Sequence, residues 1–161
     1  MASTQPGFSN ARVDFGIVVS DVGKSAAFYR TLGFKEVEGF DVPAKMGEKS
    51  GLTDKDKPFA VRVFQLGNGD DATNVKLMQF TDTPSQRPDN SYIHSSLGIR
   101  YLTLYVDDVD AAVVRARAAG AVPLAEGPYL LPAGFPEGIG LACIRDPDGN
   151  IIELLGPKRT S

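Results

Sequence analysis

The chain has 161 residues, of which 42% are apolar and 23% are charged, and its formal net charge is −3. This composition excludes a disordered chain. The absence of a basic block argues against nucleic acid as a partner. The length allows one core or two small modules. The single cysteine excludes an internal disulfide, and no secretory leader or membrane-length apolar run is present, so we expect a soluble cytoplasmic protein.

The first half of the chain opens with an alternating apolar pattern that predicts a strand over residues 13–19. Ser20 or Asp21 then provides an N-cap for a helix over residues 22–32, because their oxygens accept from open amides of the first turn. Gly33 is expected to end this helix in a left-handed conformation. Further strands of the first half are predicted over residues 34–42, 59–66 and 74–80.

Two polar segments separate these elements. Residues 43–57 are rich in lysine and contain two glycines, so we interpret them as a solvated loop, with a mobile lid over a pocket as the alternative. Residues 83–96 contain Pro84 and Pro88 among small polar residues and are predicted to be an inter-module linker.

After this linker the pattern of the first half starts again, with a strand over residues 99–106 and a helix over residues 109–119. The helix caps and the helix-ending glycines are 87 positions apart in both cases: Asp21 and Asp108, Gly33 and Gly120. Such self-similarity predicts a duplicated strand-helix-strand-strand-strand unit. The remaining strands of the second copy are expected over residues 121–124, 139–144 and 151–155, with a loop over residues 126–138.

The last predicted strand carries an acidic residue in apolar surroundings. Residues 146–150, Asp-Pro-Asp-Gly-Asn, predict a tight turn, and Ile-Ile-Glu-Leu-Leu follows at once. On a strand, Glu153 points away from the face that holds Ile152 and Leu154. A carboxylate in such a strand needs a cation, a metal, a hydrogen-bond donor or water as its partner.

Four motifs in this order resemble the vicinal oxygen chelate superfamily, the group of glyoxalases, bleomycin-resistance proteins and extradiol dioxygenases. They are Val-Ser-Asp-Val at 19–22, Phe-Tyr-Arg-Thr-Leu-Gly-Phe at 28–34, Val-Asp-Asp-Val-Asp-Ala at 106–111 and the turn at 146–150. The resemblance implies an α+β fold in which two βαβββ modules form an open barrel-like cleft. It implies a single domain over residues 1–161, with modules at about 12–82 and 98–157 and a linker at about 83–97.

Many members of this superfamily hold a divalent metal through four cleft positions, on the first and fourth strands of each module. Carried over to this chain, those positions are Asp14, Lys76, Tyr101 and Glu153. Lys76 is the less secure match, because Leu77 is its alternative. Alternation along the strand favours Lys76 in the cleft, since leucine suits the packed layer beneath the helix better than an ammonium does.

These four side chains are a poor donor set for a metal. A tightly held catalytic metal generally needs three imidazole, thiolate or carboxylate ligands, and the one histidine, His94, lies in the linker. We therefore predict no metal and no cofactor. Instead, the Lys76 ammonium is expected between the carboxylates of Asp14 and Glu153, with the Tyr101 hydroxyl donating to one of them. The alternative is a spent site whose polar groups only satisfy one another.

Other side chains receive weaker predictions. Thr103 and Tyr105 are expected to line the cleft and to contact a ring-bearing ligand, or to serve only as its wall. Arg62 is interpreted as a surface residue, with a pocket cation as the alternative. Cys143 is interpreted as a buried apolar residue and not a nucleophile.

The sequence thus predicts a superfamily member that binds a small organic molecule in the cleft without a metal. The alternative is an enzyme, a glyoxalase-like lyase or isomerase or a dioxygenase, with Glu153 as general base. It would use a metal on Asp14 and Glu153, or Lys76 as the electrophile. A scaffold that acts only through protein contacts is a third hypothesis. Whether the chain is an enzyme stays open, and the resemblance implies a homodimer with no nucleic-acid or membrane partner.

Overall fold

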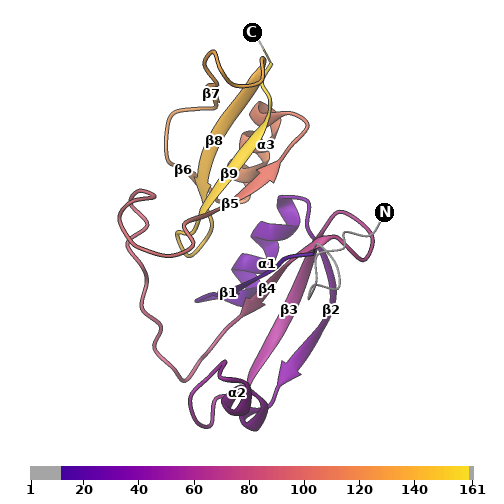
Figure 1. Ribbon diagram of the computed structural model, residues 1–161, viewed down its shortest axis with the longest axis vertical. Coiled ribbons are helices and arrows are strands. Elements are labelled where there is room, and N and C mark those ends of the chain that lie inside the picture. The colour runs from indigo at the N-terminus through magenta and orange to yellow at the C-terminus, as the bar shows by residue number, and fades with distance from the viewer. Residues whose placement is uncertain (1–11, 160–161) are drawn as a thin grey trace. The chain divides into compact units, whose positions relative to one another are not determined.

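The structure is a computed structural model that describes residues 12–159 of the chain. It contains two compact units, Met1–Pro84 and Ser85–Ser161, called unit one and unit two below. Each unit holds a β-sheet with a helix packed against one face, which confirms the predicted α+β class (Figure 1). None of the helices among residues 12–159 is long and apolar enough to span a lipid bilayer.

Unit one contains a four-stranded sheet in the order β1-β4-β3-β2, in which β1 runs parallel to β4. Its elements are β1 (Asp14–Val18), α1 (Val22–Thr31), β2 (Lys35–Val42), α2 (Ala44–Ser50), β3 (Phe59–Leu66) and β4 (Thr73–Met78). Helix α1 packs on β3 and β4 through the buried rings of Phe28 and Tyr29. Val75 and Leu77 of β4 are buried on this helix-facing side of the sheet. The other side is called the open face of unit one.

Unit two contains a five-stranded sheet in the order β5-β9-β8-β6, and β7 also pairs with β8. Its elements are β5 (Tyr101–Tyr105), α3 (Val109–Ala118), β6 (Val122–Pro123), β7 (Tyr129–Leu130), β8 (Ile139–Arg145) and β9 (Ile151–Pro157). Helix α3 packs on β8 and β9, where Ile144, Ile152 and Leu154 are buried. The opposite side of this sheet is called the open face of unit two.

The predicted internal repeat is confirmed by the helix ends of the two units. The side chain of Asp21 accepts a hydrogen bond from the amide of Lys24 at 3.0 Å, and that of Asp108 accepts one from Ala111 at 2.9 Å. Each first helix is followed by a glycine in the left-handed region, Gly33 at φ +101° and Gly120 at φ +88°. The strand-cap-helix-stop sequence is thus built in the same way in both units.

The structure corrects two of the predicted loops. Residues 43–57 contain α2, and Gly47 inside this helix permits close packing, because a Cβ there would lie 2.4 Å from the Thr53 hydroxyl oxygen. The helix ends at Gly51, which has φ +77°. Residues 126–138 contain the short strand β7, which pairs with Leu141 and Gly140 on the edge of β8.

The predicted linker is held by two arginines of unit two. The Arg100 guanidinium donates to the backbone oxygens of Asp89 at 2.7 Å and Ile93 at 3.0 Å. The Arg145 guanidinium donates to the backbone oxygens of Asn90 at 2.5 Å and Ser91 at 3.2 Å. Residues 89–93 therefore have a fixed path within unit two, although they form no helix or strand.

Candidate functional site

The open face of unit one brings together a carboxylate, two cations and an amide. The parallel register places Asp14 opposite Asn74 and Gly16 opposite Lys76, so these side chains share one face. The Lys76 ammonium lies 2.9 Å from one oxygen of Asp14, and the Arg12 guanidinium lies 3.0 Å from the other. The Asn74 amide also donates to Asp14, at 3.2 Å. Asp14 is thus engaged by several donors while its side chain is only 14% exposed.

Charge governs the protonation of this carboxyl. Burial raises the pKa of Asp14. The hydrogen bonds from Lys76, Asn74 and Arg12, together with the charge of Lys76, lower this pKa by more than burial raises it, so the net pKa lies below its usual value. Asp14 is therefore ionised at neutral pH, and it holds Lys76 in place as an ion pair.

On the fourth strand of unit one, Lys76 and Leu77 were alternatives for the cleft position, and the structure places them on opposite faces of the sheet. Leu77 is fully buried on the helix-facing side of the sheet, whereas Lys76 is partly exposed on the open face beside Asp14. The internal repeat gives the same assignment, since Gly16 is opposite Lys76 and Thr103, 87 positions after Gly16, is opposite Glu153. Lys76 is therefore the structural counterpart of Glu153.

The open face of unit two carries Glu153 with one hydroxyl partner. Thr103 is opposite Glu153 in the parallel pair of β5 and β9, and its hydroxyl donates to the carboxylate at 2.9 Å. Ile152 and Leu154 are buried on the helix-facing side, which confirms the predicted direction of Glu153. Within the described part of unit two, no basic side chain forms an ion pair with Glu153.

Two tyrosines flank this carboxylate on the same strand as Thr103. Tyr101 and Tyr105 lie at alternate positions of β5 and are 46% and 80% exposed. Within the described residues of unit two, Thr103 and not a tyrosine donates the hydrogen bond that Glu153 accepts. The predicted contacts of Lys76 with Glu153, and of Tyr101 with either carboxylate, stay predictions.

A buried aspartate fixes the turn that precedes Glu153. Asp146 is 5% exposed, and its carboxylate accepts from the amide of Asp148 at 2.9 Å and from the backbone and side-chain amides of Asn150 at 2.8 and 2.9 Å. Gly149 adopts φ +88°, as the turn requires. This network sets the point at which β9 begins and therefore helps to position Glu153.

The remaining candidate residues have local structural partners. Arg62 donates to Glu36 from two nitrogens, at 2.7 and 3.0 Å, and its guanidinium lies 5.7 Å from the centre of the Phe64 ring. Since Arg62 is opposite Leu77 in the sheet, it lies on the helix-facing side and not with Lys76. His94 stacks on Tyr92 in the linker, with ring centres 5.6 Å apart.

Cys143 lies opposite Glu153 in the antiparallel pair of β8 and β9 and is partly exposed. Burial, and to a lesser degree the negative charge of Glu153, raises the pKa of the Cys143 thiol. A raised pKa disfavours the thiolate. The prediction that Cys143 is buried is wrong, since the residue is partly exposed, and its assignment as an apolar residue and not a nucleophile stays a prediction.

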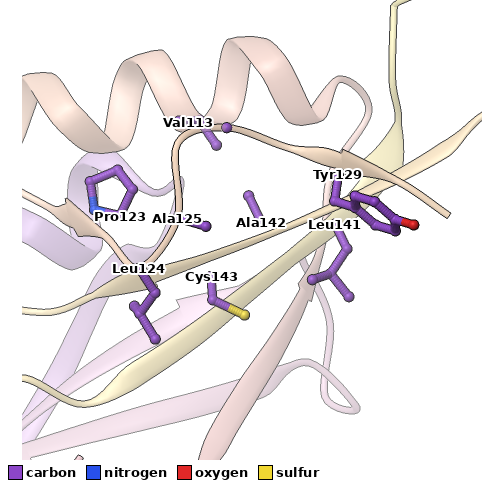
Figure 2. Close-up of a pocket in the computed structure, with 9 residues that line it drawn as sticks. Val113, Pro123, Leu124, Ala125, Tyr129, Leu141, Ala142 and Cys143 are labelled. Carbon is purple, nitrogen blue, oxygen red and sulfur yellow. The ribbon is translucent and has the colours of Figure 1, made fainter. Parts of the chain in front are cut away.

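The structure contains an apolar cavity in unit two that was not predicted from the sequence (Figure 2). Its volume is about 230 Å³. It is bordered by α3, by β8 and by the chain between β6 and β7, including Val113, Leu124, Tyr129, Leu141 and Cys143.

Taken separately, neither unit offers a donor set that fits a divalent metal. Among residues 12–159 no three His, Cys, Asp or Glu side chains gather in a way that could hold an ion. At the positions that the resemblance assigns to metal ligands, Asp14 already binds the Lys76 ammonium, and this ammonium has no lone pair to offer. The hydroxyl of Tyr101 is a weak ligand. The thiol of Cys143, which is opposite Glu153 across the sheet, has a raised pKa that disfavours its metal-binding thiolate form.

The duplicated units, each a sheet with one helix on one face, are typical of the superfamily that contains glyoxalases, bleomycin-resistance proteins and dioxygenases. A family model described as "Glyoxalase/Bleomycin resistance protein/Dioxygenase superfamily" matches residues 12–154, and the chain belongs to this superfamily. A sequence comparison with curated proteins finds no match.

Solved structures of glyoxalases share the fold. A glyoxalase family protein from Bacillus cereus is 20% identical, with a TM-score of 0.74 over 96% of this chain and 99% of that chain. The trypanothione-dependent glyoxalase I of Leishmania major is 24% identical, with a TM-score of 0.60 over 92% of this chain and 87% of that chain. A V278E mutant of glyoxalase I from Zea mays is 18% identical, with a TM-score of 0.66 over 92% of this chain and 45% of that chain.

Proposed function

We propose that this chain binds a small organic molecule through the open-face side chains of its two units, without a divalent metal. The ligand contacts are Asp14 and Lys76 in unit one and Tyr101, Thr103, Tyr105 and Glu153 in unit two. The observation that supports this most directly is the 2.9 Å ion pair of Lys76 with Asp14, because both residues stand at positions where the family commonly places metal ligands. Lys76 thus supplies a positive charge of the protein itself where the family commonly holds a metal cation.

Several accompanying proposals follow from family membership and composition. The chain acts as a single domain of two modules, residues 12–82 and 98–157, joined by the linker at 83–97, and it forms a homodimer. It has no cofactor and no nucleic-acid partner, since its net charge of −3 is spread without a basic block.

The second candidate function is an enzyme, a glyoxalase-like lyase or isomerase or a dioxygenase. Glu153 favours this candidate, because its one hydrogen bond within the described part of unit two, from Thr103, leaves carboxylate lone pairs available to accept a proton. It would act as general base, with either a metal on Asp14 and Glu153 or the Lys76 ammonium stabilising negative charge on the substrate.

Metal analysis tests the metal-free proposal. Protein purified without chelators, dialysed against zinc, nickel, manganese and iron in turn, is expected to retain far less than one ion per chain. A stoichiometry of about one tightly bound transition metal per chain would overturn the proposal.

The Glu153→Gln variant separates a binding protein from an enzyme, with Glu137→Gln, an exposed acid of the same unit, as its matched control. For a compound that binds the wild type in a ligand screen, we expect Glu153→Gln to weaken affinity by about tenfold or more and the control to change nothing. Turnover of such a compound by the wild type, lost by orders of magnitude in Glu153→Gln at unchanged affinity, would establish the enzyme instead.

A further inference from the structure

The cavity of unit two lies at an interruption in the edge of its sheet. Strand β6 pairs with β8 at Arg145 and Ile144, and β7 pairs with β8 at Leu141 and Gly140. Between these two pairings the chain leaves β8 after the hydrogen bond from the Leu124 amide to the Cys143 oxygen, at 2.9 Å. The arch that it forms over residues 125–128 leaves the cavity between itself and the strand edge.

The walls of this cavity are almost entirely apolar. Figure 2 shows Leu141 and Cys143 pointing to one side of β8, while Ala142 points to the other side, towards Val113 on α3. Gly127 in the arch lines the cavity as well, and a Cβ added to it would meet no atom within 4 Å. A methyl group at residue 127 is therefore tolerated without displacing the wall of the cavity.

The volume limits what fits inside. A cavity of about 150 Å³ lined by aliphatic side chains takes up benzene, whereas sites for whole drug-sized molecules measure about 300 to 1,000 Å³. At about 230 Å³ this cavity accommodates one ring or a short branched alkyl group. It is sized for one end of a ligand and not for the whole of it.

Cys143 connects the cavity with the carboxylate of Glu153. The two residues are opposite each other on β8 and β9, and Cβ atoms of such cross-strand neighbours lie about 4.5–5.5 Å apart. Leu141, the other strand residue of the same wall, is opposite Leu155. A group that leaves the cavity past Cys143 therefore comes to Glu153, which is hydrogen-bonded to Thr103 but has no ion-pair partner in the described part of unit two.

We propose that this cavity binds the apolar end of a small amine, a single ring or a short branched alkyl group, while the ammonium of the same molecule pairs with Glu153. The proposal rests on the proposed function in taking Glu153 as a ligand contact. It adds the chemical class of the ligand, an arylalkyl or branched alkyl amine, and the part of the protein that selects its apolar end.

The single cysteine of the chain provides a direct probe of cavity occupancy. The rate at which methyl methanethiosulfonate modifies Cys143 in the full-length protein is measured at mildly alkaline pH, alone and with benzylamine, toluene or methylamine. Benzylamine presents both a ring and an ammonium, toluene only the ring, and methylamine only the ammonium. Each variant is compared with its own unliganded rate, so changes in the reactivity of the thiol cancel.

Benzylamine is expected to slow the modification of Cys143 at about tenfold lower concentration than toluene does, and methylamine is not expected to slow it. Glu153→Gln should remove the advantage of benzylamine over toluene. Ala125→Leu, which enlarges a side chain that lines the cavity, should weaken protection by both ring compounds. Gly127→Ala, whose single methyl group meets no neighbour within 4 Å, should retain it.

Two results would overturn the proposal. If neither benzylamine nor toluene protects Cys143 in the wild type, the cavity does not take up a ring. If both protect it equally and Glu153→Gln changes nothing, the cavity and Glu153 do not share a ligand. Neither result affects the proposed function, which is tested separately by the metal analysis and by the effect of Glu153→Gln on a compound from the ligand screen.

Discussion

Asp14 and Glu153, two carboxylates on corresponding strands, have opposite surroundings. Asp14 is bound by Lys76, Arg12 and Asn74. Glu153, by contrast, receives one hydrogen bond, from Thr103, within the described part of unit two. The first is therefore suited to hold a cation of the protein itself, and the second is suited to receive a donor from a ligand.

The acid sensitivity of unit one should depend on Asp14. Because its pKa is lower in the folded than in the unfolded chain, its contribution is present above the unfolded pKa and is lost as the pH falls through the folded pKa. We expect Asp14→Asn to lower the free energy of unfolding by about 1 kcal/mol at neutral pH, and by much less at pH about 3.

Urea unfolding of the wild type and of Asp14→Asn at both pH values measures this difference. Asp41→Asn is the matched control, since Asp41 is an exposed aspartate of the same sheet. A loss of equal size at both pH values would show that the ion pair with Lys76 is not its source.

The directions of these side chains could be predicted from the sequence, but their partners could not. Alternation of apolar residues placed Glu153 away from Ile152 and Leu154, as the structure shows. The hydrogen bond from Thr103 depends on the register between the parallel strands β5 and β9, which lie far apart in the sequence. Alternation alone does not fix such a register.

At the scale of secondary structure, the prediction from the sequence was wrong where a glycine permits close packing. Gly47 was interpreted as part of a loop, yet it lies inside α2, where its missing side chain admits Thr53. Gly33 and Gly120, which end helices with positive φ, were assigned correctly. The sequence alone does not distinguish a glycine needed for conformation from one needed for close contact.

The two equivalent helix caps should differ in strength. Asp108 is 17% exposed and also pairs with Arg159 at 2.5 Å, whereas Asp21 is 49% exposed. We expect Asp108→Ala to destabilise its unit by about 1–2 kcal/mol and Asp21→Ala to cost about 0.5–1 kcal/mol. Hydrogen exchange of the amides in α1 and α3 reports each loss separately, and equal losses would contradict the importance of Arg159.

For the molecule as a whole, duplication was the part of the architecture most visible in the sequence. The spacing of 87 positions between the two caps predicted two similar units, and the pairing of Gly16 with Lys76 and of Thr103 with Glu153 shows that the register was repeated as well. The cavity could not be predicted in this way. It arises where β6 and β7 interrupt the edge pairing of β8, and the sequence there indicates only a loop.

The arginine contacts to the backbone of residues 89–93 decide where the polypeptide can be divided. A fragment that starts at Ser85 keeps the carbonyl partners of Arg100 and Arg145, and it should fold and unfold cooperatively. A fragment that starts at Gly98 leaves both guanidinium groups without them, and it should be less stable by about 2 kcal/mol. Thermal melts of the two fragments would show the difference, and coinciding midpoints would contradict it. Residues 85–97 are therefore a structural part of the second half and not a flexible connection between the halves.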